Sequence, residues 1–429
     1  MSHNHINYEG RLTFVRSLLK EKFDINGEAE ITPIQYNPEV PFKCNNFIYG
    51  IILPPGSAPS TAFKQDSLQH GCVIIPPGSR DFILRLTNSD AEGMSPSNRV
   101  ENEVAAISIA SEALEASYPH MVPSVYAWNS TGNKSQQGWI LEEWMSGSQL
   151  DEVFEKMDLD QKRNILSQMA GILKALQEAK LPDSYIGIGG LSFDETGRIV
   201  SAVSSIGGLG PWSSYQESFK TQLHHALEKA DSSQYIRGWR ANGVRDRLDR
   251  FIEQGVQPRF EALASKDERV LVHSDLTTNN ILFDPGSGRI TGLLDYDFSC
   301  VSHPSHELLQ SLGDVQGQFR NPTGDDTEES TLMKAMLHGF PETLPETTGD
   351  VQWELAKALE DELAKVGVKR PRTIKGMDKI AEVHAVLQAV LPWRLSNADV
   401  LKLQSEEAIL NFREDSEKDL IALLDRLGF

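Results

Sequence analysis

Residues 271–299 read LVHSDLTTNNILFDPGSGRITGLLDYDFS. A cluster of turn-forming residues at 284–288 lies between two apolar runs, and this order predicts a β-hairpin. Folding the chain about that turn brings Asn280, at the start of one strand, close to Asp295, at the end of the other. An amide oxygen and a carboxylate side by side are hard oxygen ligands, which suit Mg²⁺.

Asp275 lies on the loop that enters the same hairpin, close enough to approach a hydroxyl group. Phosphoryl transfer needs little more than a carboxylate that orients the nucleophile and a metal ion that neutralises the phosphates. The order His273-x-Asp275-x-x-x-x-Asn280, followed by Asp295, therefore indicates a phosphotransferase site. An ordinary polar hairpin is the alternative, but it gives no reason for three acidic or amide groups in this order.

This segment resembles the catalytic loop of the aminoglycoside phosphotransferase and choline kinase family, written H-G-D-x-x-x-x-N. The resemblance implies that Asp275 is the catalytic aspartate and that Asn280 and Asp295 bind Mg²⁺. His273 would brace the loop rather than react. Asp297 stands where many members of the family have an acidic residue, so it is either a contact of a second metal ion or a surface carboxylate. The implied cofactors are ATP and Mg²⁺, and the implied partner is a small molecule with an acceptor hydroxyl.

The N-terminal half carries a second, weaker match. Arg85 ends a predicted strand at residues 82–86, where kinases place a phosphate-contacting Lys and many of these relatives place Arg. A guanidinium group can pair with phosphate oxygens and with a carboxylate at once. Glu103, on a helix predicted at residues 99–116, would present that carboxylate, with Glu101 as a possible substitute. A solvated helix glutamate and a strand-edge arginine remain the alternative interpretation.

Residues 139–147 read WILEEWMSG and resemble the strand-to-hinge segment of the family. Backbone groups from Glu143 to Met145 would meet the adenine, while the Trp144 side chain could equally belong to the core.

The first loop, residues 36–46, departs from the pattern because it contains no glycine. Glycine lets backbone N–H groups approach phosphates closely. We therefore expect this loop to cover ATP through Lys43, Asn45 or Asn46.

Around these motifs the chain changes from strands to helices. Leu12, Val15, Leu18 and Leu19 form one apolar face of a helix within residues 1–30. Strands are predicted at 47–53, 72–75, 82–86, 122–128 and 138–144, and helices at 158–178, 214–230, 243–263 and 379–391, with two more near the C-terminus. Asp158-x-x-Gln161 is predicted to open the helix at 158–178 as a capping box. With the resemblance, this order implies an α+β, protein-kinase-like fold of two lobes. Residues 1–144 form an N-lobe of mixed sheet plus helix, and residues 145–429 form a larger, mainly helical C-lobe that holds the catalytic hairpin.

Composition narrows the classes of protein. The chain has 429 residues, with 61 acidic against 41 basic residues and a formal net charge of −20. This balance argues against a nucleic-acid partner and fits a cationic acceptor, such as an amino-bearing metabolite, an amino alcohol or an aminoglycoside-like molecule. No apolar run approaches the roughly 18 residues of a membrane span. Three widely spaced cysteines (Cys44, Cys72 and Cys300) favour the cytoplasm, and nothing indicates an oligomeric state.

Three other functions stay open. A protein kinase is disfavoured by the glycine-free loop and by the lack of an Ala-Pro-Glu segment after Asp295. A catalytically silent, nucleotide-binding interaction protein would not need the full catalytic set. A zinc-dependent hydrolase would have to combine His303 and His306 with His273 and Asp275.

Glu307 is predicted to cap a helix. Acceptor contacts are expected in residues 208–222, with Trp212 and Tyr215, in residues 303–330 and at Trp393.

Overall fold

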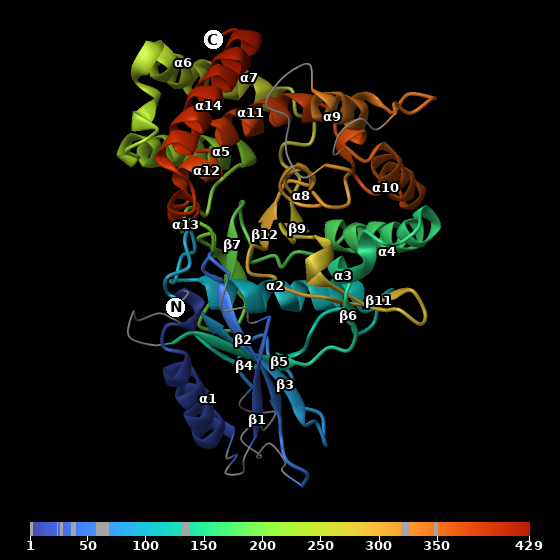
Figure 1. The fold of residues 1–429 in the computed structure, drawn as a ribbon. Coiled ribbons are helices and arrows are strands. Elements are labelled where there is room, and N and C mark those ends of the chain that lie inside the picture. The colour runs from blue at the N-terminus through green and yellow to red at the C-terminus, as the bar shows by residue number, and fades with distance from the viewer. Residues whose placement is uncertain are drawn as a thin grey trace.

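The computed structural model describes residues 3–23, 25, 29–35, 40–56, 68–130, 137–318, 327–346 and 351–429, so residues 36–39 of the glycine-free loop and 319–326 of the expected acceptor region lie outside the described residues. A five-stranded sheet in the order β1-β2-β3-β5-β4 comes first (β1 Glu30–Ile34, β2 Asn46–Ile52, β3 Asp81–Thr87, β4 Val125–Asn129, β5 Trp139–Glu143). Figure 1 shows helix α1 (Tyr8–Phe23) beside this sheet and helix α2 (Arg99–Leu114) between the sheet and the helical part of the chain. We call the sheet with α1 and α2 the N-lobe, and the elements from β6 onward the C-lobe.

One face of the sheet packs against helix α1. Tyr49, Ile51 and Leu84 on one face are buried in a cluster with Val15 and Leu19 of α1. The four apolar residues predicted to form one face of this helix are all buried, so this prediction is confirmed. Every pairing in the sheet is antiparallel, where a mixed sheet was expected.

Residues 72–75 do not form the predicted strand. Val73 donates one backbone hydrogen bond to the Val125 carbonyl at 2.8 Å, but Val73 and Ile74 are 46% and 44% exposed. Without a surface to cover these side chains, and with Pro76 and Pro77 unable to donate to a ladder, the apolar run ends as a loop.

The described part of the C-lobe is mainly helical and contains three small sheets. Strand β6 (Ser148–Gln149) joins the predicted hairpin of β10 (Ile281–Asp284) and β11 (Arg289–Leu293), β9 (Val270–Val272) pairs with β12 (Cys300–Ser302), and an unpredicted hairpin pairs β7 (Gly190–Phe193) with β8 (Ile199–Ala202). The helices are α3 (Asp151–Phe154), α4 (Leu159–Gln177), α5 (Tyr215–Ser232), α6 (Val244–Arg250), α7 (Val256–Glu261), α8 (Ser305–Gln310), α9 (Glu328–His338), α10 (Trp353–Val366), α11 (Met377–Val390), α12 (Trp393–Ser396), α13 (Ala398–Lys402) and α14 (Glu406–Leu427). The single helix predicted at 243–263 is interrupted by a π-helical turn, Phe251–Gly255. Among the described helices, none has the length and apolar character to cross a bilayer.

The lobes are joined on two sides. The chain crosses from β5 to β6 on one side, and on the other α12 and α13 come down onto the N-lobe (Figure 1). There the rings of Phe42 and Trp393 lie 5.8 Å apart, and the Lys43 amide donates to Asp399 Oδ2 at 3.3 Å. Lys43 therefore lies against α13, and the expectation that it covers ATP finds no support in its contacts.

Helix α4 begins with the capping box predicted from the sequence. Asp158 Oδ1 accepts from the Gln161 amide at 2.8 Å, and the Asp158 amide donates back to Gln161 Oε1 at 3.1 Å. We predict that Asp158→Ala lowers the free energy of unfolding by about 1 kcal/mol, because the helix loses a cap acceptor. Denaturant unfolding measures this loss. Asp158→Asn should retain most of the stability, and Asp160→Ala, in the same turn, should cost less; equal losses for all three would contradict a capping role.

Candidate active site

The β10–β11 hairpin sets the positions of two of the predicted ligands. Ile281 pairs with Leu293, and the Leu294 amide donates to the Asn280 carbonyl at 2.8 Å. Asn280 and Asp295 therefore leave the same end of the hairpin, as the sequence predicted. Asp295 has a φ of 62°, a conformation that few residues other than glycine adopt, so the backbone is held in an uncommon geometry at this position.

Asp275 and Asn280 are in direct contact. The Asn280 Nδ2 amide donates to the Asp275 backbone carbonyl at 2.9 Å and to its Oδ2 at 2.8 Å. Burial raises the pKa of Asp275 to about 6, and the nearby negative charges of Asp295 and Asp314 act in the same direction, while the Asn280 hydrogen bond opposes them. This carboxyl therefore has a higher proton affinity than an ordinary aspartate.

His273 is buried beneath the loop. Its Nδ1 accepts from the Asp275 amide at 3.3 Å, which leaves Nε2 to donate to the Leu294 carbonyl at 3.0 Å. Burial lowers the pKa of His273 to about 4, so the ring is neutral near pH 7. The ring ties the loop to the end of the hairpin.

Glu307 has a different place from the one expected. It lies on α8 but makes no cap there; its Oε2 accepts from the His273 amide at 2.6 Å and its Oε1 from the Ser274 amide at 3.0 Å. The helix-cap prediction is therefore wrong. The carboxyl satisfies two backbone donors of the catalytic loop, and burial raises its pKa to about 7.

Two further side chains hold the loop, and sequence reasoning missed both. Asp314 Oδ2 accepts from the Thr278 amide at 2.7 Å, and Ser311 Oγ accepts from the Leu276 amide at 2.5 Å. Their only signal in the sequence was their position shortly after Glu307. Together with Glu307, they fix the backbone on both sides of Asp275.

Arg85 connects the lobes at this point. Its Nη1 lies 2.5 Å from Glu103 Oε1, and its Nη2 lies 2.7 Å from Asp295 Oδ1. The ion pair with Glu103 is the one expected, and Glu101 takes no part in it. Although burial favours the neutral acid at Asp295, the Arg85 guanidinium holds the pKa of that carboxyl below its usual value.

Asp297 is neither a surface carboxylate nor open to a metal ion. Its Oδ2 lies 2.7 Å from Arg99 Nη2 and accepts from Asn46 Nδ2 at 2.8 Å, and the side chains of Asp297 and Arg99 are each 2% exposed. Asn46, which was expected to cover ATP, is therefore engaged with Asp297. Arg99, the first residue of α2, was not recognised from the sequence because its partner lies 198 residues away.

The zinc alternative is contradicted. His303 Nε2 hydrogen-bonds to Ser265 Oγ at 3.0 Å, and His306 Nδ1 to Ser302 Oγ at 3.3 Å. In the part of the chain that the structure describes, no three His, Cys, Asp or Glu side chains come together as a metal site. Tyr215 stacks on His303 with ring centroids 5.1 Å apart and is 1% exposed, so it belongs to the core and is not available to an acceptor.

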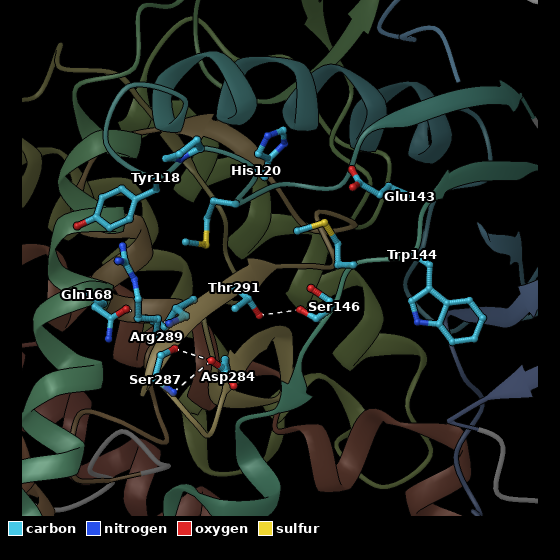
Figure 2. A pocket seen from close by; sticks show the side chains of 14 residues that line it. Tyr118, His120, Glu143, Trp144, Ser146, Gln168, Asp284, Ser287, Arg289 and Thr291 are labelled. Carbon is cyan, nitrogen blue, oxygen red and sulfur yellow. Dashed lines mark hydrogen bonds between the residues drawn. The ribbon is translucent and has the colours of Figure 1, made fainter. Parts of the chain in front are cut away.

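A cavity of about 380 Å³ lies beside the linker between β5 and β6 (Figure 2). The predicted linker residues Glu143 and Met145 line it, together with residues from α4, the hairpin turn and the α2–β4 loop. None of the catalytic-loop residues or Arg85 lines it, and Figure 2 shows Trp144 pointing away from it. The cavity is therefore separate from the catalytic cluster. The Glu143 carboxylate, which lines the cavity, already accepts a hydrogen bond from the Ser124 amide at 3.2 Å.

Comparison with known proteins gives a family and a fold. The family described as "Phosphotransferase enzyme family" matches residues 72–332, more than half of the chain. None of the curated proteins matches.

Among solved structures, aminoglycoside phosphotransferase APH(2″)-IIa in complex with gentamicin is similar at 11% identity, with 96% of this chain and 97% of that chain covered and a TM-score of 0.50. Plasmodium vivax ethanolamine kinase is similar at 12% identity, over 96% and 89% of the two chains, with a TM-score of 0.49. At such identities the likeness concerns the fold. It is an α+β, protein-kinase-like fold with a mainly helical C-terminal part, as the sequence predicted, although its N-terminal sheet is antiparallel and not mixed.

Glu307 provides a test of how the loop is held. Folding raises the pKa of Glu307, so the protonated carboxyl favours the folded state. The stability that this group contributes is therefore full below its unfolded pKa near 4.5. It is lost as the pH rises through the folded pKa of about 7. We predict that wild type loses stability relative to Glu307→Gln across this window, on the order of 1–3 kcal/mol. Urea unfolding at pH 4.5, 6 and 8 measures the difference. Glu143→Gln is the control, and a pH-independent difference between wild type and Glu307→Gln would contradict the argument.

Proposed function

Because the chain belongs to the phosphotransferase enzyme family, we propose that it transfers the γ-phosphoryl group of ATP to a hydroxyl group of a small molecule. One observation carries this proposal: Asp275, Asn280 and Asp295 converge at the end of one hairpin, and Arg85 reaches Asp295 from the opposite lobe at 2.7 Å. Phosphoryl transfer requires an orienting carboxylate, oxygen ligands for a metal ion and a cation for the phosphates, and these four residues supply them.

Asn280 and Asp295 are the residues that would hold Mg²⁺. The Asn280 amide nitrogen is engaged by Asp275, and its oxygen accepts one hydrogen bond, from Asn279 Nδ2 at 3.2 Å. The second lone pair of that oxygen is left for a cation. Asp295 gives one oxygen to Arg85, and its side chain is 38% exposed, so a cation can reach the carboxylate. This all-oxygen donor set, with few protein ligands, fits Mg²⁺, which keeps water and phosphate in its coordination shell. When bound, the ion would neutralise charge on the phosphates of ATP.

The remaining roles belong to the chain itself. Asp275, oriented by Asn280, would align the acceptor hydroxyl for in-line attack and take its proton. Arg85, steadied by Glu103, would contact the phosphates, since its Nη2 lies beside the proposed metal ligand Asp295. His273 would keep the loop in place without reacting.

We further assign the adenine to the backbone of Glu143 to Met145, on the side of the linker that faces the catalytic cluster. The boundary between the lobes would then fall between residues 144 and 145. The base would occupy the cleft between residues 1–144 and 145–429.

An amino-bearing acceptor suits the surroundings of Asp275. Asp295, Asp297 and Asp314 all raise the proton affinity of this carboxyl, so negative charge is concentrated beside the position of the hydroxyl. A neighbouring ammonium group on the acceptor would lower that repulsion. Long-range attraction by the chain's net charge of −20 would act in the same direction.

Nucleotide and metal should stabilise the protein together. We predict that ATP raises the melting temperature only when Mg²⁺ or Mn²⁺ is present, since Asn280 and Asp295 bind the nucleotide through the metal. A hundredfold excess over Kd adds about 2.7 kcal/mol to the free energy of unfolding. Thermal-shift measurements with and without a chelator check this. A shift with Zn²⁺ but none with ATP and Mg²⁺ would refute the kinase function.

Two substitutions separate the roles of the carboxylates. Asp295→Ala should weaken binding of Mg²⁺–ATP because it removes a charged ligand. Asp275→Asn should leave ATP affinity near that of wild type and lower turnover by roughly 10²–10⁴. Calorimetric titration measures the binding of Mg²⁺–ATP. A screen for ATP depletion with amino alcohols, aminoglycosides and hydroxylated metabolites measures turnover. Asp267→Asn, at an exposed position, is the control. Near-normal turnover of Asp275→Asn would rule out the assigned mechanism, and a wild type that binds ATP without any turnover would favour the silent nucleotide-binding alternative.

A further inference from the structure

Glu142 is a buried carboxyl in the face of the sheet that looks toward the cleft. In the sheet register Glu142 lies opposite Ile83, and Arg85 lies opposite Ile140. Because side chains alternate along a strand and directly paired residues share a face, Glu142 lies on the same face as Arg85. It immediately precedes the linker segment, residues 143–145, to which we assign the adenine.

The carboxyl of Glu142 has no partner. The residue is 6% exposed, its Oε2 is buried without a hydrogen bond, and no hydrogen bond or ion pair joins either oxygen to another described residue. Arg85 is the nearest source of positive charge, but its two terminal nitrogens already lie against Glu103 and Asp295. A buried polar group without a partner is costly, and native structures seldom keep one without a use.

The face of the sheet that carries Glu142 is apolar around it. Ile34, Ile48 and Ile83 lie on this face and are only partly buried. The indole of Trp144 lies directly against Gly50 on the same face, where an added Cβ would be 2.5 Å from Cζ3. Glu142 is therefore an unpaired polar group on an apolar and aromatic surface, against which a flat ring can pack.

We propose that Glu142 selects the nucleobase by accepting a hydrogen bond from the exocyclic amino group of adenine. The inference rests on the proposed function, since it assumes that a nucleotide occupies the cleft. A purine under Ile48 and Ile83, with its phosphates toward Asp295, has the edge of its six-membered ring at the corner between β5 and the linker.

The group at the 6-position of the purine explains the selection. At the 6-position adenine carries an amino donor, whereas guanine and hypoxanthine carry a carbonyl acceptor. A carboxylate can only accept, so it pairs with the amine and opposes the carbonyl. A site built around such a hydrogen bond rejects the analogue that lacks the donor, because the buried oxygen is again left unpaired.

Binding measurements test the inference without knowledge of the acceptor. With Mg²⁺ at pH 8.5, above the pKa of about 7 to which burial raises Glu142, wild type should bind ADP roughly 10–100-fold more tightly than GDP or inosine diphosphate. Glu142→Gln, whose amide can donate or accept, should bring these affinities to within about threefold of each other. Glu142→Met should weaken ADP binding and leave that of inosine diphosphate nearly unchanged.

Another carboxyl outside the proposed nucleotide site supplies a matched control. Glu101→Gln, on α2, alters a carboxyl whose Oε2 is likewise buried without a hydrogen bond, and it should keep the preference of wild type. Trp144→Ala should weaken ADP and GDP alike. An unchanged ADP preference in both Glu142 variants, or a wild type that binds ADP and inosine diphosphate equally, would overturn the role of Glu142 and leave the kinase function standing. A wild type that binds none of these nucleotides would overturn the proposed function, and the inference with it. Should the variants not fold, equal binding of ADP and inosine diphosphate by wild type would still overturn the role of Glu142.

Discussion

The ion pairs of Arg85 join two elements of the N-lobe to the end of the catalytic hairpin, 210 residues further along the chain. The guanidinium lies on β3, Glu103 on α2 and Asp295 after β11, and the pairs are 2.5 and 2.7 Å long. Because Arg85 and Glu103 are buried, removal of either would leave an unpaired charge in a poorly hydrated place. The orientation of α2 against the sheet and the position of Asp295 against both therefore depend on this one cation.

Negative charge exceeds positive charge at this junction. Glu103, Glu142 and Asp295 surround Arg85, and Asp275 lies beyond them. Burial and mutual repulsion raise the pKa values of Glu142 and Asp275, whereas the direct contact with Arg85 lowers that of Asp295. An arrangement of this kind stabilises the fold poorly by itself, because desolvation opposes each carboxylate. The same arrangement is well suited to bind a cation. A divalent ion between Asn280 and Asp295 would offset the excess of negative charge.

Local patterns in the sequence predicted much of this arrangement. The hairpin turn, the capping box at Asp158 and the apolar face of α1 each depend on residues close in the chain, and the structure contains all three. The contacts of Arg99 and Glu307 were beyond reach, because their partners lie 198 and 34 residues away and a charged residue alone does not specify its partner. The error at residues 72–75 has the same origin, since an apolar run becomes a strand only where other elements cover it.

The first turns of α2 show why the site is assembled in the folded chain before any ligand binds. Asn98 donates to the carbonyls of Leu191 and Val203, and Asn102 donates to that of Ser299, so amides of an N-lobe helix satisfy backbone groups of the C-lobe. Arg99 adds its pair with Asp297, and all three side chains are buried. Water cannot replace these bonds without opening the interface, and unpaired buried groups are expensive. Helix α2 is thus fixed to the C-lobe, and Glu103 presents its carboxylate to Arg85 as a consequence of that attachment. A closing motion of the lobes would then have to involve the strands and the linker rather than this helix.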